Sequence, residues 1–248
     1  MRVTFLGTGS AMPTGERNQT GLLVEAGDDT LLVDCGSGVL GALAGTEPGY
    51  EAADTVLLTH HHLDHVSDLL ALLKARWLAG EESLSVVGPA GTESLVTGLL
   101  DVHDYLRGRV DLDVREVDGG AFDLLEFEIG TAETVHSMEG FAYRFSHPDA
   151  DGDFCFSGDS EATADIADLA DGARVLAHDC SFPDEVDVSN HPTPNALGET
   201  LAGRDVEELL LTHLYPHTDG KHEEMIESVR ANFGGTVGMA RDGLTVEI

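Results

Sequence analysis

The chain of 248 residues is long enough for one large domain or two small ones, and no linker or low-complexity segment divides it, so we expect a single domain over residues 1–248. Its 42% hydrophobic content fits a soluble globular protein, and no run approaches the 18 apolar residues of a membrane-spanning helix, so no membrane partner is expected. Against 46 acidic residues stand 13 basic ones, which argues against a polyanionic partner because phosphate binding relies on lysine and arginine.

The acidic residues are spread over the chain instead of forming one tail, which is typical of a surface adapted to molar salt. At 1 M salt the Debye length is about 3 Å, so self-repulsion would be screened. We therefore interpret the charge as halophilic adaptation and give it little weight against a phosphate-containing substrate. The first residues lack the apolar core of a signal peptide, and Cys35, Cys155 and Cys180 are too widely spaced for a disulfide framework or a CxxC site. Together these features predict a cytoplasmic protein.

Along the chain, strands come first and helices are interleaved afterwards. The expected strands are 2–6, 21–25, 30–34, 55–59, 83–87, 127–133, 154–157, 174–177 and 208–212, with 141–145 forming a hairpin with 154–156. The expected helices are 66–79, 93–101, 161–170, 194–202 and 223–232. This order predicts an α/β arrangement in which helices cover sheets.

Five of the six residues from position 60 to 65 can ligate a metal, and they lie between an apolar strand and an amphipathic helix. His60, His62, Asp64 and His65 form the pattern His-x-His-x-Asp-His, whose three imidazoles and one carboxylate suit Zn²⁺. His61 should point away from the others by strand alternation. A polar turn that is merely rich in histidine is the alternative, and the rest of the chain argues against it.

Three further side chains stand at the ends of expected strands, namely His136, Asp159 and His213. The segments 55–60 and 208–213 are both apolar runs that end in Thr-His. Side chains at strand ends converge at a sheet edge. A lone histidine in such a place is usually structural, but three such residues behind a dense histidine motif predict a shared metal site.

These residues carry a resemblance to the metallo-β-lactamase superfamily, and within it to the ribonuclease Z-related phosphodiesterases. Besides the histidine motif, the matching segments are 5–13 with 17–18, 32–36, 135–137, 157–160, 178–182 and 211–213. The resemblance covers nearly the whole chain. It implies a four-layer αββα fold in which two mixed β-sheets are sandwiched between helices.

The resemblance also implies a binuclear metal-dependent hydrolase, in the first place a phosphodiesterase that cleaves a small or cyclic phosphodiester with a metal-bridging hydroxide. Two Zn²⁺ ions are implied, with Mn²⁺ or iron as alternatives, because paired ions clamp the attacking and leaving oxygens. The implied ligands are His60, His62 and His136 for the first ion, Asp64, His65 and His213 for the second, and Asp159 as the bridge between them.

Two catalytic candidates follow from the same resemblance. Asp64 would orient the attacking water or take its proton, and His191 would assist the transition state or the leaving group. The alternative for His191 is a histidine on a surface loop. Asp34 fits either an acceptor that orients a ligand histidine or an aspartate that caps the following turn, and the role of His178 stays open.

One departure from the family bears on the substrate. Ribonuclease Z proteins carry a long tRNA-binding arm between the positions of His136 and Asp159, which here are only 23 positions apart, the difference between 159 and 136. RNA is therefore the less favoured partner, and a ribonuclease Z-like tRNA 3′ endonuclease is kept as an alternative.

A thioester or lactam hydrolase would use the same metals, but glyoxalase II-like members append a helical region, and only 35 residues follow His213, the difference between 248 and 213. A non-catalytic module would be expected to have lost ligands. The resemblance further implies a homodimer. The identity of the substrate and of the native metal stays open.

Overall fold

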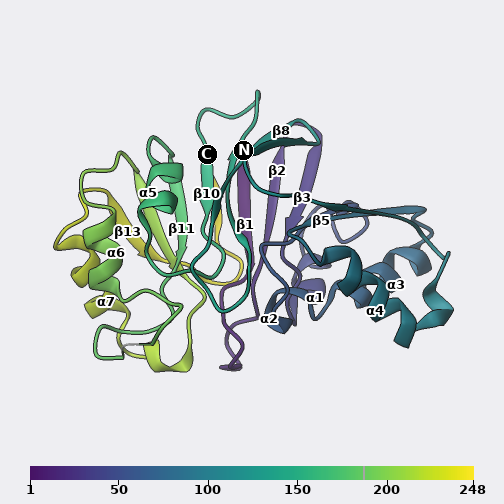
Figure 1. The fold of residues 1–248 in the computed structure, drawn as a ribbon, viewed down its shortest axis with the longest axis horizontal. Helices are drawn as coiled ribbons and strands as arrows, with labels where there is room; N and C mark the ends of the chain where they lie inside the picture. The colour runs from purple at the N-terminus through teal and green to yellow at the C-terminus, as the bar shows by residue number, and fades with distance from the viewer. Residues whose placement is uncertain (187) are drawn as a thin grey trace.

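Two seven-stranded mixed β-sheets with helices on their outer faces make up the computed structural model, which describes residues 1–186 and 188–248 (Figure 1). The first sheet has the order β14-β1-β2-β3-β4-β5-β6, with β1 Arg2–Gly7, β2 Gly21–Ala26, β3 Asp29–Val33, β4 Thr55–Leu57, β5 Ser83–Gly88, β6 Asp111–Glu116 and β14 Thr245–Glu247. The second has the order β13-β12-β11-β10-β9-β8-β7, with β7 Ala121–Leu124, β8 Phe127–Glu133, β9 Phe141–Ser146, β10 Phe154–Phe156, β11 Val175–Asp179, β12 Glu208–Thr212 and β13 Thr236–Met239.

The helices form the two outer layers, so the predicted four-layer αββα fold is confirmed. The first sheet is covered by α1 Val39–Leu43, α2 Leu63–Val66, α3 Leu69–Ala79 and α4 Thr92–Val102. The second is covered by α5 Ala164–Ala170, α6 Pro194–Thr200 and α7 His222–Arg230. In Figure 1 these two groups lie on opposite sides of the paired sheets. No helix among the described residues has the length and hydropathy needed to cross a membrane.

Alternating apolar side chains explain the layers. In β3, Leu31 and Val33 face the other sheet while Leu32 faces the helices, and in β12 the inner residue is Leu210. Because side chains alternate across a strand, a continuous apolar run buries both faces of a sheet. The layer between the sheets is rich in aromatic side chains, which are Phe5, Phe127, Phe141, Tyr143, Phe145, Phe154 and Phe156.

The structure differs from the expected elements in three respects, of which the first is the short helix α1, which was not predicted. The expected helix 66–79 begins later, as α3, and only its first expected residue belongs to α2; between the two helices the carboxylate of Asp68 accepts the backbone N–H groups of Gly38 and Leu40 and so caps α1. The strands β6, β7, β13 and β14 were not predicted. All four are edge strands, and edge strands carry exposed or charged residues that weaken the apolar pattern.

Chain ends and loops lie at opposite ends of the sheets. Met1 and Ile248 are hydrogen-bonded to each other, with the N-terminal nitrogen 3.1 Å from the Ile248 carbonyl oxygen. In Figure 1 the termini lie at the upper edge and α2 lies at the lower edge. At the lower end, Gly9 pairs with Leu214 and joins the first loop to the segment after β12. The loops that follow β4, β8, β10 and β12 therefore meet there.

Candidate metal centre

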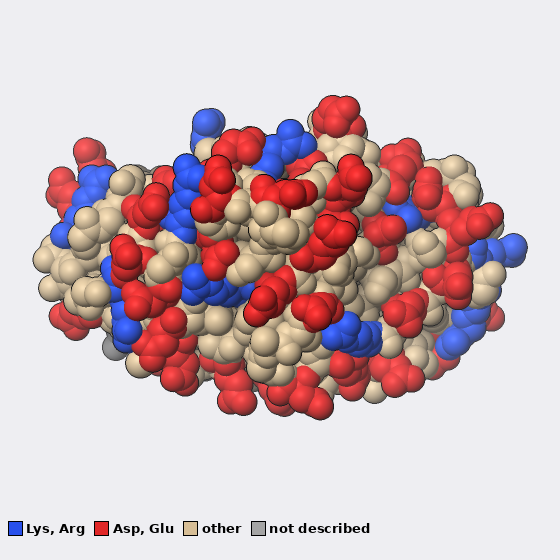
Figure 2. All heavy atoms as spheres, turned by 90° about the horizontal axis from the view of Figure 1, so that it is seen from above, with Lys and Arg blue, Asp and Glu red and all other residues tan. Residues whose placement is uncertain are grey.

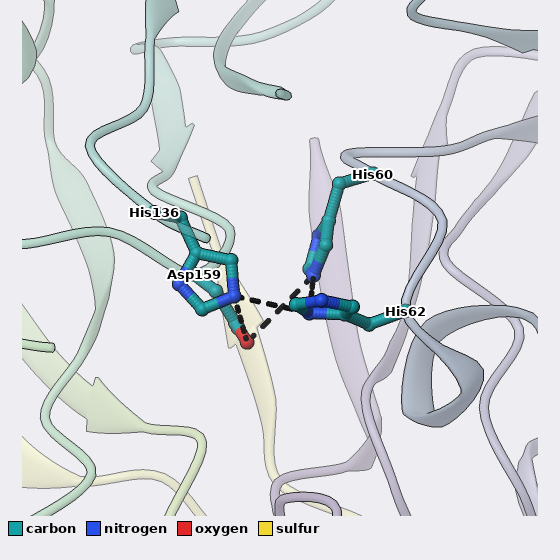
Figure 3. A group of neighbouring side chains, drawn as sticks. All are labelled: His60, His62, His136 and Asp159. Atoms are coloured by element: carbon teal, nitrogen blue, oxygen red, sulfur yellow. Dashed lines mark hydrogen bonds and ion pairs between the residues drawn. The ribbon is translucent and has the colours of Figure 1, made fainter. Parts of the chain in front are cut away.

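Seven histidine and aspartate side chains meet at the end of the two sheets that lies opposite the termini. They come from the loop after β4, from α2 and from the loops after β8, β10 and β12, and they form two groups that share one residue. The groups are His60, His62, His136 and Asp159, and Asp64, His65, Asp159 and His213. All seven predicted metal-site residues are thus brought together. Figure 3 shows the first group, whose side chains point toward one another.

In the first group, the spacing of the ligand atoms suits a small cation. His60 Nε2 and His136 Nε2 lie 3.1 and 3.0 Å from His62 Nδ1. Asp159 Oδ2 lies 3.8 Å from each of the two Nε2 atoms. Ligand atoms about 2.0–2.1 Å from a tetrahedral Zn²⁺ would be about 3.3 Å apart. The observed spacings bracket that value.

The second group contains buried atoms that lack a hydrogen-bond partner. His213 Nε2 is 3.2 Å from both Asp64 Oδ2 and Asp159 Oδ2. His65 Nε2 and Asp159 Oδ1 are 3.2 Å apart, yet both are buried without a hydrogen bond among the described residues. Buried polar atoms are rarely left unsatisfied. A cation bound between these atoms would satisfy both, so the donor set fits a metal ion.

Hydrogen bonds behind the candidate ligands determine which ring nitrogen faces the centre. In four of the five histidines, Nδ1 lies 2.8–3.1 Å from an oxygen, and Nε2 is left to face inward. The acceptors are the hydroxyl of Thr59 for His60, the carboxylate of Asp34 for His65, the carbonyl of Asn190 for His136 and the hydroxyl of Ser181 for His213. Such bonds set the tautomer that a metal ligand needs.

Strained backbone surrounds the centre. Asp34, Asn190 and His213 have φ angles of 59°, 75° and 57°. A positive φ is costly for residues other than glycine and persists where the surroundings impose it. Asp34 also accepts the backbone N–H of Thr59 at 2.8 Å, so its carboxylate orients the ring of His65 and does not cap the following turn.

The two groups differ in the charge that their surroundings favour. Burial lowers the pKa of His60 well below its usual value, with His65 adding to the effect, and burial also lowers the pKa of His62. At His65 and His213, burial is outweighed by carboxylates, Asp159 first among them, and the pKa of both rings is raised. The first group therefore favours neutral imidazoles, as a metal requires, and the second favours positive charge at its centre.

His191 lies at the metal centre and not on an outer loop surface. It lines a cleft of about 380 Å³, together with Ala11, Leu63, Ser137 and Tyr215 and with His62, Asp64, His136 and Asp159. His191 Nδ1 donates to Asp179 Oδ2 at 2.7 Å. Burial lowers the pKa of His191, but the hydrogen bond and charge of Asp179 outweigh it, so the pKa is raised overall. Burial and nearby carboxylates raise the pKa of Tyr215 to about 12.

Asp179 and Ser181 are residues that sequence analysis missed. Asp179 is fully buried, and its carboxylate accepts from the hydroxyl of Ser181 at 2.6 Å as well as from His191. The side chain of the neighbouring His178, which the sequence had singled out, hydrogen-bonds to the backbone carbonyl of Asp179 and to no other described residue. Strand alternation is the sequence signal that could have identified Asp179. Ala177 and Asp179 share the inner face of β11, while His178 lies on the opposite face.

Two further groups have ligand-like residues. Asp179, His191 and His213 overlap the centre already described. Asp29, Glu126 and His147 lie elsewhere, and His147 Nε2 is buried without a partner. However, His147 Nδ1 accepts the backbone N–H of Asp149 at 3.1 Å, so the proton of the neutral ring is on Nε2. A protonated nitrogen cannot ligate, and this group does not fit a metal ion.

Comparisons of sequence agree with the fold and the centre. A protein-family model described as anti-Pycsar protein Apyc1 matches residues 1–230. Ribonuclease Z of Mycobacterium avium is 32% identical over 275 positions, which cover 100% of this chain and 98% of that protein. Ribonuclease Z of Methanothermobacter thermautotrophicus is 28% identical over 303 positions, which cover 100% of this chain and 97% of that protein.

Solved structures match over the same length. The metallo-β-lactamase fold protein YhfI from Bacillus subtilis superimposes with a TM-score of 0.84 and 26% identity, covering 99% of this chain and 98% of that one. The short form of human tRNase Z has a TM-score of 0.80 and 21% identity, with 100% and 99% covered. Zn²⁺-bound PqqB from Methylobacterium extorquens shares the fold with a TM-score of 0.80 and 17% identity, with 100% of both chains covered.

Proposed function

Since the chain belongs to the metallo-β-lactamase superfamily, in the branch that holds the ribonuclease Z relatives and the anti-Pycsar Apyc1 family, we propose that it hydrolyses a small or cyclic phosphodiester with two bound metal ions. The protein is a metal-dependent hydrolase. The observation that carries the finer proposal is the pair of groups that share Asp159 at a cleft whose described lining residues include no lysine or arginine.

The proposed ligands divide according to those two groups. His60, His62 and His136 would hold one ion, and Asp64, His65 and His213 the other, with Asp159 common to both groups. The unsatisfied buried atoms of His65 and Asp159 support this assignment. Zn²⁺ suits the imidazole-rich set, and Mn²⁺ or iron are the alternatives.

Bound ions would activate water and neutralise the charge of the phosphate. Asp64 lines the cleft, where it would orient the attacking water or hold its proton. His191 is held at Nδ1 by Asp179, so Nε2 is the nitrogen left to exchange a proton within the cleft. The raised pKa of His191 favours the protonated ring, which suits a group that protonates the leaving oxygen. Asp179 acts as a positioning residue in this scheme.

A tRNA 3′ endonuclease like ribonuclease Z is the second candidate, because the mycobacterial relative aligns with the whole chain. Two observations favour the small substrate. The alignment has at least 27 positions that this chain lacks, the difference between 275 and 248. None of the described residues that line the cleft is a lysine or an arginine, and these are the side chains that hold a polyanion.

A substrate comparison tests the proposal. The metal-loaded protein in molar KCl is offered bis(p-nitrophenyl) phosphate, cyclic nucleotides, a precursor tRNA, a thioester and a cephalosporin. We expect the small diesters to give the highest kcat/KM. The salt dependence is a second readout, because a tRNA-binding enzyme loses affinity steeply as salt rises. Any cleavage of tRNA by this acidic protein should instead increase with KCl, because salt screens the repulsion between the protein and the tRNA.

Each contrary outcome has its own meaning. Precursor tRNA as the best substrate, cut at its 3′ end, would replace the proposal with the second candidate. Hydrolysis of the thioester alone would remove the phosphodiesterase assignment and leave the metal-dependent hydrolase.

A further inference from the structure

Tyr215 stands in the wall of the cleft, two residues after His213. Its backbone N–H donates to the carbonyl of Ser181 at 3.3 Å. Its own carbonyl accepts the hydroxyl of Thr218 at 2.8 Å. The backbone of Tyr215 is therefore tied to the loop after β11 and to the turn that follows.

The ring of Tyr215 is held on more than one side. It stacks on Phe182, with ring centroids 4.6 Å apart and planes inclined by 25°. The rings of His191 and His213 meet it edge-on, at centroid distances of 5.9 and 5.7 Å. Aromatic contacts of this kind restrict the ring to one orientation. The ring direction is thus set without help from the hydroxyl.

The hydroxyl of Tyr215 has no hydrogen-bond partner in the described part of the chain. The buried hydroxyl of Tyr143, in contrast, donates to the carbonyl of Leu58 at 2.9 Å. A tyrosine hydroxyl is protonated at neutral pH and is both donor and acceptor. Tyr215 therefore offers an oriented O–H donor that the fold itself does not use.

The cleft offers a phosphate few other donors. Among the described lining residues, Ala11 and Leu63 are apolar, and the carboxylates can only accept when ionised. His191 is assigned to proton transfer. Ser137 also has a hydroxyl, but it is exposed and no aromatic packing orients it. A phosphodiester has two non-bridging oxygens, and negative charge on them must be stabilised as the reaction proceeds.

We propose that the Tyr215 hydroxyl donates a hydrogen bond to a non-bridging phosphate oxygen of the substrate, and that Tyr215 is thereby a substrate-binding residue of the phosphodiesterase reaction. This inference rests on the proposed function. Because the ring is already oriented by Phe182, the donor needs little reorganisation when the substrate binds.

The first test is Tyr215→Phe, which removes the hydroxyl and keeps the stacked ring. With bis(p-nitrophenyl) phosphate, kcat/KM should fall about 10- to 100-fold, the usual effect of a lost hydrogen bond to a charged group. Metal content and melting temperature should equal those of the wild type. Tyr105→Phe, at an exposed site with its ring beside Lys74, is the matched control and should leave kcat/KM unchanged. Full activity of Tyr215→Phe would overturn the proposal, and so would a loss of activity that accompanies loss of metal.

The second test uses the two diastereomers of a cyclic nucleoside phosphorothioate. Sulfur is a weak hydrogen-bond acceptor, so the penalty of Tyr215→Phe should shrink for the isomer whose sulfur replaces the oxygen that Tyr215 contacts. Equal penalties on both isomers would indicate a structural role and overturn the proposal.

A binding measurement separates this inference from the proposed function. Calorimetry with inorganic phosphate and the metal-loaded protein should show a Kd that is several-fold weaker in Tyr215→Phe than in the wild type. If the wild type hydrolyses no phosphodiester, the proposed function fails, yet phosphate binding still decides the role of Tyr215. An unchanged Kd in the variant, or no phosphate binding by the wild type, would overturn it.

Discussion

Asp159 is the side chain that the two groups of candidate ligands share. Its carboxylate is 4% exposed and lies 3.2–3.8 Å from four histidines. Desolvation raises its pKa, but the surrounding histidines, His213 first among them, outweigh this and lower the pKa well below its usual range. The carboxylate therefore stays ionised, which is the form that binds cations.

We expect Asp159→Asn to reduce the metal content from two ions per chain to one at most and to abolish hydrolysis, because an amide cannot bridge two cations. Elemental analysis of protein purified without chelator measures the content. Asp29→Asn is the control, since the group of Asp29 and His147 does not fit a metal. Two ions in Asp159→Asn, or a single ion in the wild type, would contradict the binuclear assignment.

Loss of His191 should affect turnover and not metal binding, unlike loss of a proposed metal ligand. His191→Ala should leave both metal ions bound and lower kcat by about 10²–10⁴, the usual cost of a lost proton-transfer group. His103→Ala, at an exposed position, is the control and should cost nothing. Single-turnover rates and metal content are measured on the same samples. A variant that keeps the full kcat on a good phosphodiester would show that His191 has no such role.

Helices and strands position these side chains, and the contact between α6 and α7 shows how closely they pack. A Cβ added at Gly198 in α6 would lie 2.6 Å from the carbonyl oxygen of Val229 in α7 and 3.0 Å from its Cα. Both neighbours are backbone atoms of a second helix, which cannot move independently. Gly98 in α4 has nothing within 4 Å of the same position.

The pair Gly198→Ala and Gly98→Ala separates helix propensity from packing. Gly98→Ala should raise the free energy of unfolding by about 0.5–1 kcal/mol, the gain in helix propensity. Gly198→Ala should lower it by about 1–3 kcal/mol, because overpacking outweighs the same gain. Urea unfolding in constant KCl measures both. A stabilised Gly198→Ala would show that α6 and α7 are less tightly apposed.

Over the whole molecule, the dominant property is the formal net charge of −33. Figure 2 shows acidic side chains over all parts of one face, with basic ones scattered between them. We expect the melting temperature to fall steeply when KCl is diluted from molar to 0.1 M. The Debye length then grows from about 3 to about 10 Å, so the repulsion between acidic side chains is no longer screened. Full stability in dilute buffer would rule out the halophilic interpretation.

Assembly is a second property at this scale, and the family resemblance predicts a homodimer. Leu63, which lines the cleft, is an exposed apolar side chain, and so are Met12 and Val135, which adjoin the lining residues Ala11 and His136 in the sequence. Light scattering in molar KCl should give twice the chain mass of 26.3 kDa. A mass of 26.3 kDa at all concentrations would refute the dimer.

The sequence alone determined the features whose signals are local. Four of the metal-site residues lie within positions 60–65, so their convergence needs only one turn between a strand and a helix. Central strands such as β2, β3 and β12 were predictable because burial on both faces demands a continuous apolar run. The resemblance carried by these segments extended the prediction to the four-layer fold.

Tertiary structure alone decided the features that depend on distant partners. The edge strands carry no strong apolar pattern, because one side of each is open to solvent. At the break between α2 and α3, the carboxylate of Asp68 accepts the backbone N–H of Gly38, 30 residues earlier in the chain. Asp179, Ser181 and Tyr215 acquire their roles from sheet register and ring packing that bring β11, β12 and their loops together. Such contacts are set by the whole fold, so no local sequence pattern predicts them.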